Sequence, residues 1–142
     1  MSKPDSLQRF IDAQEPLYEE VCAELRAGRK TSHWMWFIFP QHVALGTSDR
    51  AKSYGLYGVE QAREYLAHPV LSQRLKECCD LILQHRDLSA AQIFGEVDSV
   101  KLRSSMTLFN QADPDEAVFA QVLDCFYGGR VDPLTLDLIQ PK

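Results

Sequence analysis

The chain has 142 residues, of which 45% are hydrophobic and 25% are charged, and this is the composition of an ordinary globular domain. Its net charge of −5 argues against a general nucleic-acid-binding protein, which usually carries a basic face. No segment approaches the roughly 18 consecutive apolar residues of a membrane span, and the N-terminal residues lack the apolar stretch of a signal peptide. We therefore expect a cytoplasmic protein.

Proline and glycine divide the N-terminal half into segments of helical length, in which apolar residues recur three or four positions apart. We expect Ser6 to cap a first helix and Pro16 to begin a second, which Gly28 ends. Residues 42–48 are expected to form a loop, after which Ser48 caps a short helix. A further helix is predicted over residues 59–67.

Pro69 begins what we predict to be the longest helix, which reaches about Arg86. Its predicted apolar stripe comprises Val70, Leu71, Leu75, Cys78, Cys79, Ile82 and Leu83. Ser89 and Gln92 match a capping box for a short helix that ends at Gly95.

Three aspartates in the C-terminal part are predicted to cap helices. Asp98 would cap a helix over 99–112, and Asp113-Pro114 would begin a helix that ends near Tyr127. Asp132-Pro133 would begin a last short helix. Its inward-facing residues are expected to be Leu134, Leu138 and Ile139.

Signals for β-strands are almost absent, since no alternating run exceeds four residues and no Asn-Gly hairpin occurs. We predict a single all-α domain over residues 1–142, with an ordered core at about 6–139 and six to eight short and medium helices. The lack of coiled-coil heptads favours a monomer over an oligomer.

The first candidate site is the aromatic segment 32–41, which contains Trp34, Trp36 and two phenylalanines. These rings could form part of the core. Periodicity does not distinguish a short buried helix from a strand here, but the lack of partner strands favours a helical turn that becomes extended before Pro40. Three polar residues suggest a second interpretation: His33 precedes Trp34, Gln41 follows Pro40, and Lys30 lies upstream. Cations, an imidazole and aromatic faces together suit a planar or anionic ligand.

The second candidate site is the segment 101–109, which is predicted to be helical. Lys101, Ser104 and Ser105 share one face, and Arg103 and Thr107 share another. Three hydroxyl residues in four positions are poor helix formers. Either they allow close helix packing by bonding to preceding carbonyls, or they form a polar pocket wall in which Lys101 and Arg103 hold an anion. A serine–lysine nucleophile lacks its companion motifs.

Other chemistry finds little support in the sequence. The four cysteines form no C-x-x-C, so we expect reduced, mostly buried thiols, and a cysteine nucleophile has no supporting motif. The four histidines lack the spacing of a metal site, and the glycine-rich phosphate-binding motifs are absent. We predict no metal and no cofactor.

Three segments of the sequence carry a family resemblance: residues 7–13 with 25–30, the run HWMWFIFPQ at 33–41, and KLRSSMTLF at 101–109. They resemble a family of short, mostly bacterial proteins of unknown function, some of which bear the label "calpastatin". The resemblance extends over about residues 6–139 and implies an all-α single domain. It implies no reaction, cofactor or catalytic residue. Calpastatins are disordered inhibitors, whereas this composition predicts a folded domain.

Two hypotheses for function follow. In the first, a small anionic or nucleotide-like molecule binds in a pocket, with His33 as general base if a reaction occurs. That pocket would be lined by Trp34, Trp36, Gln41, Lys101, Arg103, Ser104 and Ser105. In the second, part of the cluster 34–39 or the end 134–139 is an exposed apolar patch that docks a protein partner. The first hypothesis requires the two candidate segments to lie together in the fold.

Overall fold

The computed structural model describes residues 7–46 and 48–139, except for the side chain of Arg50. Within these residues it contains ten α-helices, one 3₁₀ helix (η1) and no strand, so the all-α prediction is confirmed. The helices are α1 Gln8–Gln14, α2 Tyr18–Ala27, α3 Met35–Ile38, η1 Val43–Leu45, α4 Asp49–Ser53, α5 Val59–Ala67, α6 Pro69–Leu83, α7 Ala90–Phe94, α8 Glu96–Ala112, α9 Ala117–Tyr127 and α10 Pro133–Ile139. Seven of these ten α-helices have seven residues or more. No described helix is both long and apolar enough to span a membrane.

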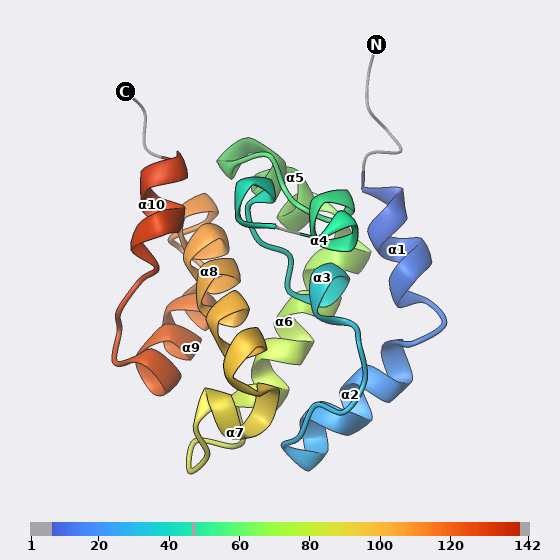
Figure 1. Cartoon of the computed structure of the whole chain (residues 1–142), viewed down its shortest axis with the longest axis vertical. Helices are drawn as coiled ribbons and strands as arrows, with labels where there is room; N and C mark the ends of the chain where they lie inside the picture. The colour runs from blue at the N-terminus through green and yellow to red at the C-terminus, as the bar shows by residue number, and fades with distance from the viewer. Residues whose placement is uncertain (1–6, 47, 140–142) are drawn as a thin grey trace.

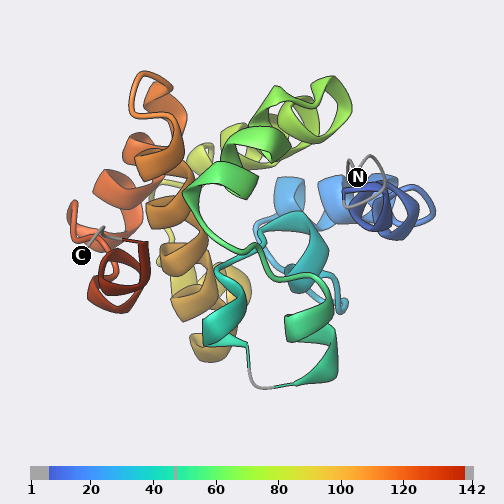
Figure 2. The same cartoon turned by 90° about the horizontal axis from the view of Figure 1, so that it is seen from above.

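The long helices α6 and α8 form the centre of the molecule (Figure 1). Helix α8 packs against α5, α7, α9 and α10, whereas α6 packs against α1, α2, α5 and α9. The view in Figure 2 shows α1 and α2 on one side of this centre and α9 and α10 on the other. The short helices α3 and α4 and their loops lie between these two sides and complete the face seen in Figure 1.

A row of aromatic rings connects the helices through the core. Phe10 meets Tyr65 edge to face at a centroid distance of 5.2 Å, and Tyr65 lies 5.3 Å from Phe109. Phe109 in turn stacks on Phe119 at 5.6 Å. All four side chains are fully buried. Because such rings bury large apolar areas and also prefer these geometries, this row stabilises the packing of α1, α5, α8 and α9.

The aromatic segment contains the helical turn that the sequence favours. Helix α3 covers Met35–Ile38, and Phe39 leaves the helical conformation, with φ −125° and ψ 71°, before Pro40. Most of its side chains lie in the core, among them Trp34, Met35, Phe37, Ile38 and Phe39. Trp36 is the only one of the six residues 34–39 that is not buried.

Several predicted helix ends are confirmed. Gly28 ends α2 in the left-handed region at φ 76°, and Gly128 ends α9 at φ 62°. Ser89 and Gln92 form the predicted capping box, with hydrogen bonds of 3.0 and 2.7 Å. The Ser48 hydroxyl accepts a hydrogen bond from Ala51 N at the start of α4. The predicted cap at Ser6 lies outside the described residues.

Two predicted helix starts are wrong. Helix α8 begins at Glu96 rather than after Asp98, because Gly95 at φ 84° lets the chain pass directly from α7 into α8. Asp98 therefore lies in the first turn of α8, where its carboxylate is available to other partners. Helix α9 begins at Ala117 instead of Pro114, since residues 113–116 form a turn that is closed by Glu116 N donating to Asp113 O at 3.1 Å.

Other corrections concern length and orientation. Helix α6, with 15 residues, is shorter than α8, with 17. Val70 lies at the exposed start of α6 and does not contribute to its buried stripe. Leu134 and Leu138 of α10 are 62% and 42% exposed instead of docked inward. Of the predicted inward residues, Ile139 is partly buried against the core, and the fully buried residue of α10 is Thr135, whose hydroxyl donates to Asp132.

Candidate functional site

The loop between α2 and α3 carries a nearly buried lysine. The Lys30 side chain is 8% exposed, and its ammonium lies 2.9 Å from a carboxylate oxygen of Asp98. The same ammonium donates a hydrogen bond to the carbonyl of Ser32 at 2.6 Å and lies 5.0 Å from the Trp34 ring centre. The backbone N–H of Lys30 also donates to the carbonyl of Ile93 at 2.7 Å. Through these contacts Lys30 connects the loop that carries it to the start of α8.

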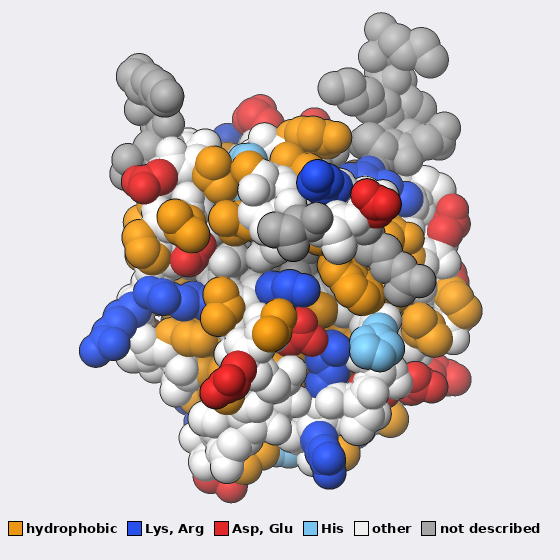
Figure 3. All heavy atoms as spheres, viewed as in Figure 1, with side chains coloured by type: hydrophobic (Ala, Val, Ile, Leu, Met, Phe, Trp, Pro, Cys, Tyr) orange, Lys and Arg blue, Asp and Glu red, His pale blue; other side chains and the backbone are white. Residues whose placement is uncertain are grey.

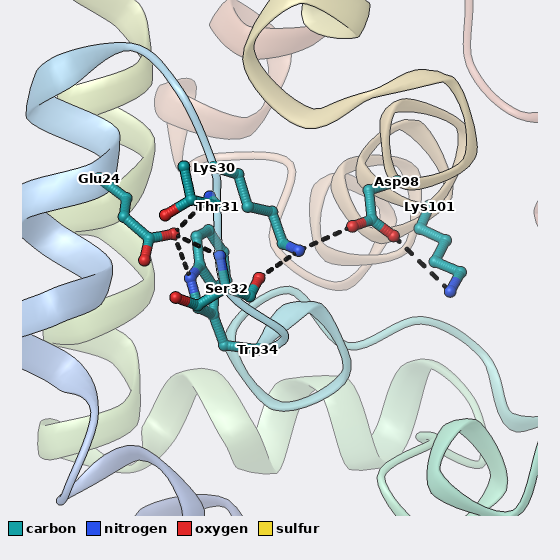
Figure 4. Close-up of polar contacts among 7 residues, drawn as sticks. All are labelled: Glu24, Lys30, Thr31, Ser32, Trp34, Asp98 and Lys101. Carbon is teal, nitrogen blue, oxygen red and sulfur yellow. Dashed lines mark hydrogen bonds and ion pairs between the residues drawn. The ribbon is translucent and has the colours of Figure 1, made fainter.

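Asp98 lies between two lysines, as Figure 4 shows. One carboxylate oxygen contacts Lys30, and the other lies 3.7 Å from the ammonium of Lys101. The Lys101 side chain is 27% exposed and one turn along α8 from Asp98. The two cations are therefore held unequally: Lys30 tightly and in the interior, Lys101 loosely and at the surface.

Lys101 also connects α8 to the aromatic segment. Its ammonium lies 5.6 Å from the centre of the Trp36 ring, which is within the range of a cation–π contact. Both residues line a small depression together with Met35, Phe39, Gln41, Ala51 and Tyr54. The depression has a free volume of about 10 Å³, which is room for about one water molecule.

Gln41 is positioned in this depression by its backbone. Gln41 O accepts a hydrogen bond from Leu56 N at 2.9 Å, and Leu56 O accepts one from Val43 N at 2.8 Å. This short pairing, with a parallel bridge between His42 and Leu56, holds the segment after Pro40 beside the end of α4. Trp36 and Gln41, from the segment 32–41, thus lie beside Lys101 of α8 in one depression.

Glu24 on α2 organises the loop that carries Lys30. Its Oε1 accepts hydrogen bonds from Thr31 N at 2.8 Å, Ser32 N at 3.0 Å and Trp34 Nε1 at 2.9 Å. Burial by itself raises the pKa of Glu24, but the hydrogen bonds from Ser32, Thr31 and Trp34 outweigh burial and lower the pKa to about 2. The sequence did not single out Glu24, because a carboxylate on an amphipathic helix gives no signal of its partners.

The sequence of this chain matches the family model described as "Protein of unknown function (DUF1810)" over residues 4–139. The chain belongs to this family. It is also similar to a solved structure, that of the conserved hypothetical protein Rv1873 from Mycobacterium tuberculosis. The two share 46% sequence identity and a TM-score of 0.95, over 99% of this chain and 100% of the other. No curated protein matches the chain.

Membership in the DUF1810 family is consistent with the resemblance that the sequence motifs indicate. The match to the mycobacterial protein extends over nearly the whole chain, so the two proteins share the entire helical arrangement. The family is one of unknown function and the mycobacterial protein is a conserved hypothetical protein, so neither supplies a reaction or a ligand. The function of this DUF1810 member therefore has to be argued from its own residues.

The two candidate segments lie side by side, but only part of each meets. Trp36, Gln41 and Lys101 line the same depression. Trp34 is fully buried behind them and packs edge to face on Phe94. His33 is exposed and is not among the residues that line the depression. Its role as a general base stays a prediction.

Arg103 and Ser104 face the C-terminal segment of the chain. Arg103 donates hydrogen bonds to the carbonyls of Arg130 at 2.8 Å and Val131 at 2.7 Å. Ser104 donates to a carboxylate oxygen of Asp132 at 3.1 Å. Their donors therefore serve to hold the segment before α10, and they do not line the depression with Lys101.

Ser105 differs from its neighbours. It lies one turn after Lys101 on α8 and is fully buried, and among the described residues its hydroxyl has no hydrogen-bond partner. Unpaired buried hydroxyl groups are uncommon because they lose hydration without compensation.

No group of three or more metal-ligating side chains occurs within the described ranges.

The surface around the depression carries mixed charge. Figure 3 shows basic and acidic side chains close together between α8 and α3, with apolar side chains around them. The three groups at its centre, Lys30, Asp98 and Lys101, sum to one positive charge. This arrangement offers one accessible cation and one aromatic face, the elements by which a protein holds a planar anion.

Proposed function

We propose that this protein binds a small anionic molecule with a planar, nucleotide-like group at the site formed by Trp36, Gln41 and Lys101. The observation that carries the proposal is the position of the Lys101 ammonium, 5.6 Å from the Trp36 ring centre at the surface end of a lysine–aspartate–lysine cluster. A cation beside an aromatic face can pair with an anion while the ring stacks on a planar group.

Lys101 can leave Asp98 at low cost. The carboxylate keeps Lys30 at 2.9 Å, so its charge stays compensated when Lys101 turns toward a ligand. The Lys101 contact at 3.7 Å is longer and partly exposed, and surface ion pairs of this kind are weak. We infer that Lys101 exchanges between Asp98 and the bound anion.

The small depression supports a ligand that lies on the surface rather than in a preformed cavity. A free volume of about 10 Å³ excludes anything larger than water while Lys101 covers Trp36. A planar group would take the place of the ammonium above the Trp36 ring. Gln41, which can both donate and accept hydrogen bonds, would then meet the edge of that group.

The proposal is tested by a thermal-shift screen of the purified protein against nucleotides, dinucleotides, sugar phosphates and inorganic phosphate. A ligand at 100 times its Kd adds about 2.7 kcal/mol to the free energy of unfolding. That corresponds to a Tm increase of several degrees, at about 2–4 °C per kcal/mol. Quenching of Trp36 fluorescence by the same compound provides a second readout.

Lys101→Met and Trp36→Leu should each abolish the shift. Lys76→Met is the matched control, since Lys76 also forms an ion pair, with Glu116 at 2.8 Å, but does not line the depression. Asp98→Asn should strengthen binding, because it removes the anion that competes for Lys101. An unchanged ligand shift in Lys101→Met, or no shift with any compound, contradicts the proposal.

A second candidate function rests on α10. Leu134 and Leu138 are spaced four residues apart and expose 62% and 42% of their surface. Such a pair on one helical face can dock against an apolar surface of a protein partner. The cluster 34–39 is largely buried, so this hypothesis now depends on α10 alone.

The test is photo-crosslinking in cells from a photoreactive residue at position 134, with the exposed position Gln73 on α6 as control. A discrete protein crosslinked from position 134, absent from position 73 and lost in Leu138→Asp, supports a partner. Equal crosslinking from the two positions contradicts this second function.

A further inference from the structure

Two cysteines face each other between α2 and α6. Cys22 lies in α2, Cys78 lies in α6, and the two helices pack together. Contacts between the two helices lie on either side of this pair. The Tyr18 hydroxyl, one turn before Cys22, donates to the carbonyl of Arg74, one turn before Cys78, and His85 Nε2 lies 2.9 Å from the carbonyl of Leu25. Neither cysteine takes part in a disulfide in this structure. The sequence predicts reduced, mostly buried thiols here and gives no motif for a reactive pair, since the two residues are 56 positions apart.

Of these two cysteines, Cys22 is the one that solvent can reach. Although only 5% of its surface is exposed, it lines a surface hollow of about 260 Å³. The other lining residues are Tyr18, Glu19, Arg26 and Glu77. Cys78 is fully buried and does not line this hollow. A small molecule in the hollow therefore meets Cys22 first, with Cys78 next to it in the core.

The groups around Cys22 stabilise its thiolate. A hydrogen bond from Cys78 is the largest cause that lowers the pKa of Cys22 to about 6; burial opposes it, and Tyr18 and Arg26 support it. The negative charge of Glu77, on α6, raises the pKa of Cys22. Its carboxylate accepts a hydrogen bond from the Tyr18 hydroxyl. The same contact with Cys22, together with burial, raises the pKa of Cys78.

We propose that Cys22 is a site of oxidation by small hydroperoxides, and that Cys78 converts the product into a disulfide between α2 and α6. In the first step the Cys22 sulfur attacks one peroxide oxygen and the O–O bond breaks. Cys22 becomes a sulfenic acid, and the other oxygen leaves as water or an alcohol. Two electrons pass from sulfur to the hydroperoxide.

In the second step the Cys78 sulfur attacks the sulfur of the Cys22 sulfenic acid. The S–S bond forms and the S–O bond breaks, and the hydroxyl leaves as water with the proton from Cys78. Cys78 is suited to this step by its position beside Cys22, where α2 and α6 pack together.

The other two cysteines provide internal comparisons. Cys79, adjacent to Cys78 on α6, is fully buried against Met106, with an Sγ–Sδ distance of 3.7 Å, and burial raises its pKa. Cys125 on α9 is partly exposed. If solvent exposure alone decided reactivity with peroxide, Cys125 would react before Cys22. If the groups that stabilise the thiolate decide, Cys22 reacts first.

The experiment treats the reduced full chain with one equivalent of hydrogen peroxide and maps the products by peptide mass spectrometry. We expect a Cys22–Cys78 disulfide in the wild type and in the Cys125→Ser control. In Cys78→Ser, dimedone should trap the sulfenic acid at Cys22. In Cys22→Ser, Cys78 should form neither a disulfide nor a sulfenic acid that dimedone traps.

Alkylation by iodoacetamide at pH 6 tests the same site without an oxidant and does not require a disulfide to form. Cys22 should react at least about tenfold faster than Cys125. The substitutions Cys78→Ala and Tyr18→Phe should each slow the alkylation of Cys22. Glu77→Gln should accelerate it, since Glu77 opposes the thiolate. Faster alkylation of Cys125 than of Cys22, or peroxide products that do not include Cys22, overturns the proposal. A persistent sulfenic acid at Cys22 in the wild type overturns the part assigned to Cys78.

Discussion

The carboxylate of Glu24 accepts a hydrogen bond of 2.9 Å from the indole Nε1 of Trp34, and both side chains are buried. The same oxygen also accepts two backbone N–H groups of the loop between α2 and α3. That loop carries Lys30, which in turn holds Asp98 beside Lys101. The position of the proposed anion site therefore depends on a carboxylate that does not belong to it.

Replacing Glu24 with alanine should destabilise the protein by about 3 kcal/mol, because three donors lose their acceptor in a buried environment. Chemical denaturation followed by far-UV circular dichroism measures this change. Glu20→Ala is the matched control, since its hydrogen bond with the Ser32 hydroxyl is exposed, and it should cost less than about 1 kcal/mol. Equal losses in the two variants would contradict the role of Glu24.

Glu24 should also contribute to the acid sensitivity of the protein. Its pKa in the folded state is lowered to about 2, so the carboxylate stabilises the fold fully above the unfolded-state value of about 4.5. This contribution is lost as the pH falls from about 4.5 through about 2. The free energy of unfolding, measured as the pH is lowered across this range, should fall less steeply for Glu24→Gln than for the wild type. Parallel curves would show that other carboxylates account for the acid response.

Asp132 should hold α10 in place. Its carboxylate accepts hydrogen bonds from Ser104 Oγ at 3.1 Å, Thr135 N at 3.1 Å and Thr135 Oγ1 at 2.6 Å. Asp132→Ala should cost about 2–3 kcal/mol, because it leaves buried donors unpaired. Hydrogen exchange should then accelerate in α10 much more than in α6. Asp137→Ala, an exposed aspartate on the same helix, should leave both measurements unchanged.

Replacement by alanine should destabilise the protein at Ser104 but not at Ser105. Ser105→Ala removes a buried hydroxyl that lacks a partner among the described residues, so stability should be unchanged or rise by up to about 1 kcal/mol. Ser104→Ala removes the hydrogen bond to Asp132 and should cost about 1 kcal/mol. Thermal denaturation of the two single variants measures the difference. A destabilised Ser105→Ala would reveal a partner for this hydroxyl.

The local sequence was sufficient to predict the helical fold and many helix ends. Gly28 and the Ser89–Gln92 capping box depend on interactions within a few residues, and both occur as predicted. The start of α8 was misplaced because Asp98 matches a capping residue in sequence while its carboxylate pairs with two lysines in the fold. Likewise, Leu134 and Leu138 follow the spacing of a buried stripe but are exposed, and α10 packs through Thr135 and Ile139.

Sequence alone determined that this is an all-α domain, because helical periodicity and caps are encoded over stretches of three to ten residues. It also identified the aromatic segment 32–41 and the segment 101–109, within α8, as the candidate sites. Only the tertiary structure decided which of them meet: Trp36, Gln41 and Lys101 line one depression, while Arg103 and Ser104 hold the segment before α10. The same holds for the Cys22–Cys78 pair, which packing of α2 on α6 creates. Contacts between residues so far apart depend on how whole helices pack, and no local pattern records that packing.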